Sequence, residues 1–215
     1  MQRCHAVASN SVRHCEKGNK LKLYGSPISP FSRKAMVIAR ELDLKLEILP
    51  RPDNVEEFRR INPLGKIPAL ALNDGSVLFD SPVICEYLNQ LGGGKFFPGN
   101  SIWRSNTGKW KSLTLQALGD GLADAAVAVM GENRQAAPNE SHIARHRAAL
   151  TAALDMLEKV KFSEVPTIGE ISVACALGYI EFRKLELDWR VSRPKLGAWY
   201  DKFCEFASMR ATAPK

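Results

Sequence analysis

The period of the hydrophobic pattern changes along the chain and divides it into two halves. In the first half, short apolar runs indicate strands, and longer runs with apolar residues three and four apart indicate helices between them. The expected strands are 21–25, 44–50, 67–72 and 76–79, and the expected helices are 31–44, 54–61 and 81–91. The opening strand–helix–strand unit predicts a parallel pair, and the turn Asn73-Asp74-Gly75 predicts that the last two strands form an antiparallel hairpin.

The second half is expected to be entirely helical. A stretch rich in glycine and proline, residues 92–100, separates it from the first half. Beyond it, prolines divide the helical pattern into segments at about 102–131, 139–160, 168–186 and 194–207. We therefore predict an α/β domain of order βαβ-α-ββα over residues 20–95, followed by an all-α domain over 102–212. Residues 1–19 form an N-terminal extension that we expect to be disordered.

Composition and charge narrow the function classes. The 215 residues include 30 lysines and arginines against 23 acidic residues, a net charge of +7, but the excess is spread along the chain. Binding to nucleic-acid phosphates needs a dense basic face, so we expect no nucleic-acid partner. No run of about 18 apolar residues occurs, so we expect no membrane-spanning segment.

The cysteines indicate the redox compartment. There are five, they form no CxxC pair, and an odd number argues against a disulfide framework. We therefore predict free thiols and a reducing, cytoplasmic location. Cys85 and Cys175 lie in apolar helical segments and are expected to be buried.

Ser29 stands where the first strand turns into the first helix, in the stretch Ser29-Pro30-Phe31-Ser32. Serine before proline is a typical helix N-cap. A ligand thiol placed at the same point would meet the helix dipole and a hydroxyl, and both favour its anion. The serine would then stabilise a sulfur that belongs to the ligand.

Pro68 opens the third strand, after Ile67. A trans proline at a strand entry is the ordinary interpretation. A cis proline would turn the backbone of Ile67 outward, where its N–H and C=O could pair with a short extended peptide. The residues alone leave both isomers open.

Asp80 and Ser81 precede the third helix, with Pro82 next. Ser81 is predicted to be the N-cap of this helix, with proline at the first helical position. A helix N-terminus with a hydroxyl also suits a ligand carboxylate, and a neighbouring aspartate suits an ammonium. Together they fit the head group of an α-amino acid.

These motifs resemble those of the glutathione transferase family. "SPFSRK", "NPLGKIPAL" and "DSPVICEYL" occur in the order and approximate spacing of the family's thioredoxin-like domain, and "PTIGEISVACALGYIEFR" is similar to its buried-helix motif. In that motif Thr167 and Glu170 match a capping box. The resemblance covers about residues 20–212 and implies a thioredoxin-like domain followed by a helical transferase domain.

The resemblance also implies roles for single residues. Ser29 matches the activating residue, although Ser26 and Ser32 lie close by in the sequence. The residues matching the glutathione-binding positions are Lys66 for the glycine carboxylate, Ile67 for backbone pairing, Pro68 as the cis-proline, and Asp80 and Ser81 for the γ-glutamyl end. Tyr24 lies in a strand and does not match a catalytic tyrosine. Family members are usually homodimers.

The implied activity is a transferase that joins the thiol of glutathione to a small apolar electrophile, as in detoxification. No cysteine stands at position 29 or 32, so a mixed disulfide with glutathione cannot form there. Two alternatives stay open: a glutathione-binding or protein-interaction module without efficient turnover, and a glutathione-dependent peroxidase. Phe31, Trp103 and Trp110 are candidates for the electrophile pocket, although helical spacing also suits core packing.

No metal cofactor is expected. His142 and His146 are four residues apart on a predicted helix, a spacing that can bind a metal ion. No third ligand is evident near them in the sequence, so a solvated pair is the preferred interpretation. Cys4-His5 and His14-Cys15 also lack the spacing of a standard zinc site.

Overall fold

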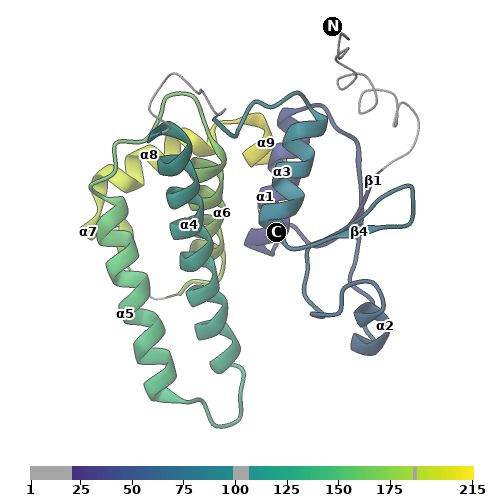
Figure 1. Cartoon of the computed structure of the whole chain (residues 1–215). Helices are drawn as coiled ribbons and strands as arrows, with labels where there is room; N and C mark the ends of the chain where they lie inside the picture. The colour runs from purple at the N-terminus through teal and green to yellow at the C-terminus, as the bar shows by residue number, and fades with distance from the viewer. Residues whose placement is uncertain (1–20, 99–106, 186–187) are drawn as a thin grey trace, which may run out of the picture.

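The computed structural model describes residues 21–98, 107–185 and 188–215. They form a mixed α/β domain and a helical domain, which lie side by side (Figure 1). The N-terminal extension 1–19 and Trp103 lie outside the described residues, so the predictions made for them stay predictions.

The sheet of the first domain has four strands in the order β2-β1-β3-β4. They are β1 (Leu21–Tyr24), β2 (Leu46–Leu49), β3 (Ala69–Ala71) and β4 (Val77–Leu78). β1 and β2 are parallel, whereas β3 is antiparallel to both β1 and β4. The predicted parallel crossover and the predicted hairpin are confirmed.

Two helices cover one face of this sheet. α1 (Pro30–Glu41) and α3 (Ser81–Leu91) pack against each other, and their apolar side chains meet those of the central strands. The short α2 (Val55–Arg59) lies apart from them (Figure 1), and its buried Phe58 ring approaches the Tyr24 ring with centroids 5.9 Å apart. Tyr24 lies in β1, as predicted, and its ring packs against Phe58 of α2.

In its described residues the second domain consists of helices joined by turns and loops. Its helices are α4 (Thr107–Glu132), α5 (Glu140–Leu157), α6 (Ile168–Phe182), α7 (Trp189–Ser192), α8 (Pro194–Cys204) and α9 (Ala207–Ala211). The segment predicted as one helix over 194–207 is divided into α8 and α9, and the segment predicted to run to residue 186 ends at Phe182. Periodicity predicted these helices but not their ends.

α6 is the centre of the helical domain, and every residue from Ile168 to Ile180 is buried. Its N-terminus carries the predicted capping box: Gly169 N–H donates to Thr167 Oγ1 at 3.2 Å, and Thr167 N–H donates to Glu170 Oε2 at 2.9 Å. α4 approaches α6 closely because Gly119 has no side chain. A Cβ there would lie 2.7 Å from the backbone nitrogen of Val173.

By length and composition, one described helix, α4 over Gly108–Glu132, could cross a membrane. In the structure α4 packs against α5 and α6 and buries Leu122, Ala126 and Val129. A helix that supplies the core of a domain is expected to be apolar in this way. Packing therefore accounts for its composition.

The cysteines predicted to be buried are buried. Cys85 lies in α3 and Cys175 in α6, and both side chains are inaccessible to solvent. Burial raises the pKa of the Cys85 thiol to about 12 and that of Cys175 to about 11, because a thiolate loses its hydration in an apolar surrounding. Both act as core side chains and not as nucleophiles.

Two buried cations of α1 hold the domains together. Lys34 donates to both carboxylate oxygens of Asp120 in α4, at 2.6 and 2.8 Å. Arg33 donates from Nη2 to the carbonyl oxygen of Met209 in α9 at 3.0 Å and from Nε to Thr212 Oγ1 at 3.4 Å. α1 is thus fixed to the sheet by its apolar residues and to the helical domain by two charges.

Candidate functional site

The strand register brings three separate segments to one edge of the sheet. Tyr24 pairs with Ala69, and Leu70 pairs with Leu78. Because β3 is antiparallel to both neighbours, the end of β1, the start of β3 and the end of β4 meet there. Ser29 follows the first of these points, Ile67-Pro68 precede the second, and Asp80-Ser81 follow the third. The three motifs predicted from the sequence therefore share this edge.

Ser29 is the N-cap of α1, as predicted. Its backbone is extended, and its Oγ accepts a hydrogen bond from the Ser32 N–H at 3.3 Å. This bond uses an oxygen lone pair and leaves the hydroxyl proton available to a further acceptor. The side chain is half-buried, and no acidic residue lies in the first turn of the helix. A negative charge placed beyond Ser29 would face the positive end of the helix dipole.

The neighbouring serines differ from Ser29 in their exposure. Ser32 is fully buried, and its Oγ has no hydrogen-bond partner among the described residues. It lies under Gly25, where an added Cβ would come within 2.8 Å of this oxygen. Ser26 is half-buried and accepts the Ile28 N–H at 3.3 Å. Ser26 and Ser29, but not Ser32, can reach a ligand at this edge.

The Ile67–Pro68 peptide bond is cis. Ile67 is half-buried, and the β3 ladder begins only at Ala69. Lys66 is exposed at the surface of the preceding loop.

The loop before Pro68 is held by Asn62, which the sequence analysis did not identify. Asn62 is buried, its Nδ2 donates to the Lys66 carbonyl oxygen at 2.6 Å, and its Oδ1 accepts the Leu64 N–H at 3.1 Å. Asparagine before Pro63 and Gly65 is a turn signal that could have indicated this role. Asn62 thus fixes the backbone that presents Lys66 and Ile67.

The predicted N-cap of α3 is wrong by one residue. Asp80, not Ser81, is the N-cap, and Ser81 is the first helical residue, followed by Pro82. The reason is that Asp80 is still extended, with φ −94° and ψ −157°, whereas the chain is already helical at Ser81. The Asp80 side chain makes no capping hydrogen bond and is exposed, while Ser81 is buried. The Asp80 carboxylate is therefore not used by the helix.

Two segments of the chain match the two domains of one protein family. Residues 23–96 match the glutathione S-transferase N-terminal domain, and residues 140–202 match the C-terminal domain. The GST-like protein YibF of Escherichia coli (strain K12) is 32% identical over 203 residues, which are 90% of this chain and 98% of that protein. The chain belongs to the glutathione S-transferase family.

Solved structures of the family agree with the fold. A glutathione transferase family member from Pseudomonas fluorescens Pf-5, with bound glutathione, is 38% identical and has a TM-score of 0.77 over 91% of this chain and 100% of its own. The same coverage is found for a glutathione S-transferase from Methylobacillus flagellatus KT with glutathione bound, at 34% identity and a TM-score of 0.80. The Pseudomonas protein has also been crystallised with S-(propanoic acid)-glutathione, with a TM-score of 0.72. The predicted thioredoxin-like and helical transferase domains are confirmed.

The helical transferase domain adds charge near the sheet edge. Asp120 and Asp124 lie one turn apart on α4. Partial burial and the neighbouring Asp120 carboxylate raise the pKa of Asp124, while Lys66 acts to lower it. Burial also raises the pKa of Asp120, against the effect of Lys34. Neither acid was identified from the sequence, because both belong to a helix far from the sheet along the chain.

The electrophile pocket predicted from the sequence stays a prediction. Phe31 is half-buried in α1, and Trp110 in α4 is 61% exposed. Two cavities among the described residues lie elsewhere: one of about 580 Å³ lies beside Trp189, and one of about 660 Å³ lies beside Phe162 and Trp199. The Phe162 and Trp199 rings are stacked, with centroids 3.7 Å apart, so these two aromatic residues pack against each other.

Proposed function

We propose that this protein binds glutathione at the shared edge of the sheet and transfers its sulfur to a small apolar electrophile. The observation that carries the proposal is the register that brings Ser29, Ile67-Pro68 and Asp80-Ser81 to one edge. Two relatives at 38% and 34% identity, which align with 91% of this chain, were crystallised with glutathione. We infer the same ligand here.

Each part of glutathione has a matching group at this edge. The backbone of Ile67 would pair with the cysteinyl residue, and the Lys66 ammonium would bind the glycine carboxylate. The Asp80 carboxylate, exposed and not used for capping, would bind the γ-glutamyl ammonium, and Ser81 would lie at the γ-glutamyl carboxylate with the N-terminus of α3. These interactions would place the cysteinyl sulfur beside Ser29.

The Ser29 hydroxyl would donate to the sulfur. An ordinary thiol has a pKa of about 8.5 and is mostly protonated at neutral pH. A hydrogen bond from Ser29 and the N-terminus of α1 would both stabilise the thiolate, and the proton would leave to solvent. The thiolate would then attack an electrophilic carbon. The new C–S bond would form as the leaving group departs with its electron pair, or as a conjugated double bond takes up a proton.

Carbon–sulfur chemistry is favoured over peroxide reduction by one relative. The Pseudomonas protein was crystallised with S-(propanoic acid)-glutathione, in which the sulfur carries a carbon substituent.

We also propose that the protein is cytoplasmic and forms a homodimer. Light scattering of the purified protein would test the homodimer. A monomer would contradict that part alone.

Titration with glutathione tests the proposed function directly. Heat of binding and thiolate absorbance would be followed across pH, with S-methylglutathione as the matched control because it has no ionisable thiol. We expect both ligands to bind, and we expect the pKa of bound glutathione to lie well below that of free glutathione. Binding without this decrease would indicate a glutathione-binding module without turnover. Absence of binding would overturn the proposal.

Replacing Asp80 with asparagine tests the ammonium site. We expect the affinity for glutathione to fall by about ten- to a hundredfold, because a hydrogen-bonded ion pair contributes about 1.5–3 kcal/mol. Glu86→Gln is the matched control, since Glu86 is exposed on the same helix and its removal changes the net charge equally. Equal affinities for the two variants, measured by calorimetry, would remove Asp80 from the site.

A further inference from the structure

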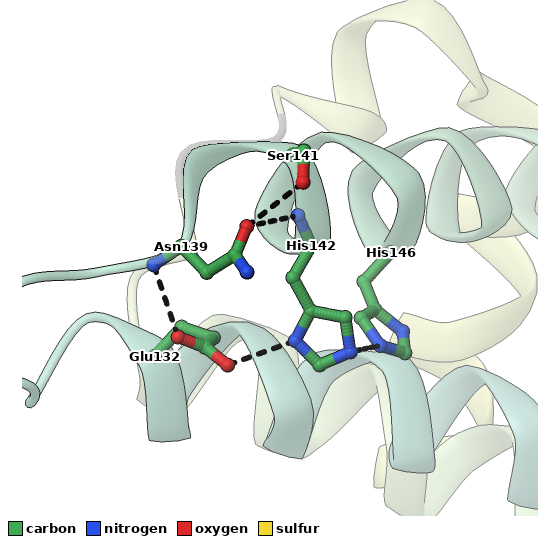
Figure 2. A network of polar contacts seen from close by, with 5 residues as sticks. All are labelled: Glu132, Asn139, Ser141, His142 and His146. Carbon is green, nitrogen blue, oxygen red and sulfur yellow. Dashed lines mark hydrogen bonds and ion pairs between the residues drawn. The ribbon is translucent and has the colours of Figure 1, made fainter.

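A polar network joins the end of α4 to the start of α5 (Figure 2). Glu132 is the last residue of α4, and Asn139 is the N-cap of α5. Glu132 Oε2 accepts the Asn139 N–H at 3.2 Å, and Asn139 Oδ1 accepts the His142 N–H at 3.1 Å and the Ser141 hydroxyl at 2.8 Å. The turn between the two helices is therefore tied at both of its ends.

Two imidazole rings extend this network along α5. His142 Nδ1 lies 2.8 Å from Glu132 Oε1, and His142 Nε2 lies 3.1 Å from His146 Nε2. The ring centroids are 4.5 Å apart, and the ring planes are nearly perpendicular. A carboxylate accepts a proton from Nδ1, so the neutral His142 ring carries its single proton there and its Nε2 presents a lone pair. The hydrogen bond between the rings is then donated by His146 Nε2.

We propose that His142 and His146 chelate one divalent transition-metal ion through their Nε2 atoms. With metal–nitrogen bonds of about 2.0–2.1 Å, nitrogens held 3.1 Å apart give an N–metal–N angle of roughly 100°, between the octahedral and tetrahedral values. The ion replaces the ring-to-ring hydrogen bond. The His146 proton moves from Nε2 to Nδ1, so the charge of the ring does not change.

Glu132 is the outer-sphere partner in this site, because it contacts Nδ1 of His142 and not the ion. A carboxylate on the far nitrogen of a metal-binding histidine fixes the orientation of the ring and raises its basicity. Glu132 is itself oriented by the Asn139 N–H. One ligand is thus pre-oriented, and the second lies one helical turn away on the same element, so chelation requires only rotation of the two side chains.

The donor set selects the class of ion. Imidazole nitrogen suits Ni²⁺, Zn²⁺ and Cu²⁺, whereas Mg²⁺ and Ca²⁺ prefer oxygen ligands. Among the described residues no group of three or more potential ligands surrounds a common point, so two histidines hold the ion and water completes its coordination. Both rings are only half-buried, so solvent reaches the site and the bound ion can exchange with ions in solution. The sequence indicated a solvated pair because Glu132 lies ten residues before His142.

The experiment measures Ni²⁺ and Zn²⁺ binding to the full, untagged chain by calorimetry, with Mg²⁺ as the negative control. Cys4, His5, His14 and Cys15 are replaced by serine or alanine in the reference protein, because these residues could bind metal themselves. We expect one Ni²⁺ ion per chain and weaker binding of Zn²⁺. The Tm should rise when either ion is bound.

Three variants of this reference protein locate the ion. We expect His146→Ala to lower the Ni²⁺ affinity at least tenfold, and Glu132→Gln to lower it by about ten- to a hundredfold. Arg145→Ala is the matched control, because it changes a neighbouring exposed residue of α5 and keeps both rings. Its affinity should be unchanged or slightly higher, since a repelling charge is removed.

Two results would overturn the proposal: no Ni²⁺ binding to the reference protein, or equal affinity in the reference protein and His146→Ala. Glutathione affinity should be the same in all of these proteins. The metal site and the glutathione site can therefore fail independently.

Discussion

Ser29→Ala is expected to lower the rate of glutathione transfer by roughly ten- to a thousandfold while glutathione affinity changes little. The hydroxyl would act on the sulfur only as charge develops there, and loss of one such donor has an effect of this size. The other contacts proposed for glutathione, at Lys66, Ile67, Asp80 and Ser81, lie elsewhere on the edge of the sheet. The measurement is kcat and KM with a model electrophile across pH, together with the pKa of the bound thiol.

The N-cap role of Ser29 complicates the alanine variant, because removing an N-cap costs about 0.5–2 kcal/mol of stability. Ser29→Thr keeps both the cap and the hydroxyl, so it should keep most of the rate. Ser29→Asp keeps the cap but replaces the donor with a negative charge, so it should keep Tm and lose the rate. Equal rates in wild type and Ser29→Asp would show that Ser29 acts only as a cap.

Ser26→Ala completes this series. Ser26 is the other half-buried hydroxyl in the loop, and its Oγ accepts from Ile28 N–H. We expect little change in rate, because Ser26 is not at the helix terminus. If Ser26→Ala, and not Ser29→Ala, lowers the rate, the donor is Ser26.

Local sequence patterns predicted the elements that meet at the edge of the sheet, but not the contacts that α1 makes with the helical domain. The α3 range of 81–91, the hairpin at Asn73-Asp74-Gly75 and the capping box of α6 all depend on residues close in the chain. The site motifs are also short and lie beside strand ends. For these reasons sequence periodicity and turn chemistry were sufficient to place them.

The buried charges of α1 could not be predicted in this way. A lysine next to an arginine in a helix ordinarily indicates a solvent-facing side. Here α1 has the sheet domain on one side and the helical domain on the other, so Arg33 and Lys34 are 3% and 1% exposed. Their partners are 86 to 179 positions away in the sequence. The N-cap of α3 was missed for a smaller reason, since Asp80 and Ser81 are both good capping residues and only the backbone angles decide between them.

Lys34→Met is expected to cost about 3–5 kcal/mol of unfolding free energy, because it leaves the largely buried Asp120 carboxylate without its countercharge. The single variant Asp120→Leu should be similarly destabilised, since it leaves a buried ammonium. The double variant Lys34→Met/Asp120→Leu should lose much less than the sum of the two, because neither charge is then buried alone. Lys22→Met, at an exposed position of β1, is the matched control and should change the free energy by less than about 0.5 kcal/mol.

The pH dependence of Lys34→Met provides a second test of the same ion pair. Burial raises the pKa of Asp120 in the folded protein, and removing Lys34 removes the interaction that opposes this rise. A carboxyl with a raised folded-state pKa binds more protons in the folded than in the unfolded chain, so its contribution to stability increases as the pH falls. The deficit of Lys34→Met relative to wild type should therefore narrow between about pH 7 and pH 5 in urea unfolding, while that of Asp120→Leu should not. A deficit that is constant with pH in both variants would mean that lost packing, and not the unpaired carboxylate, causes the destabilisation.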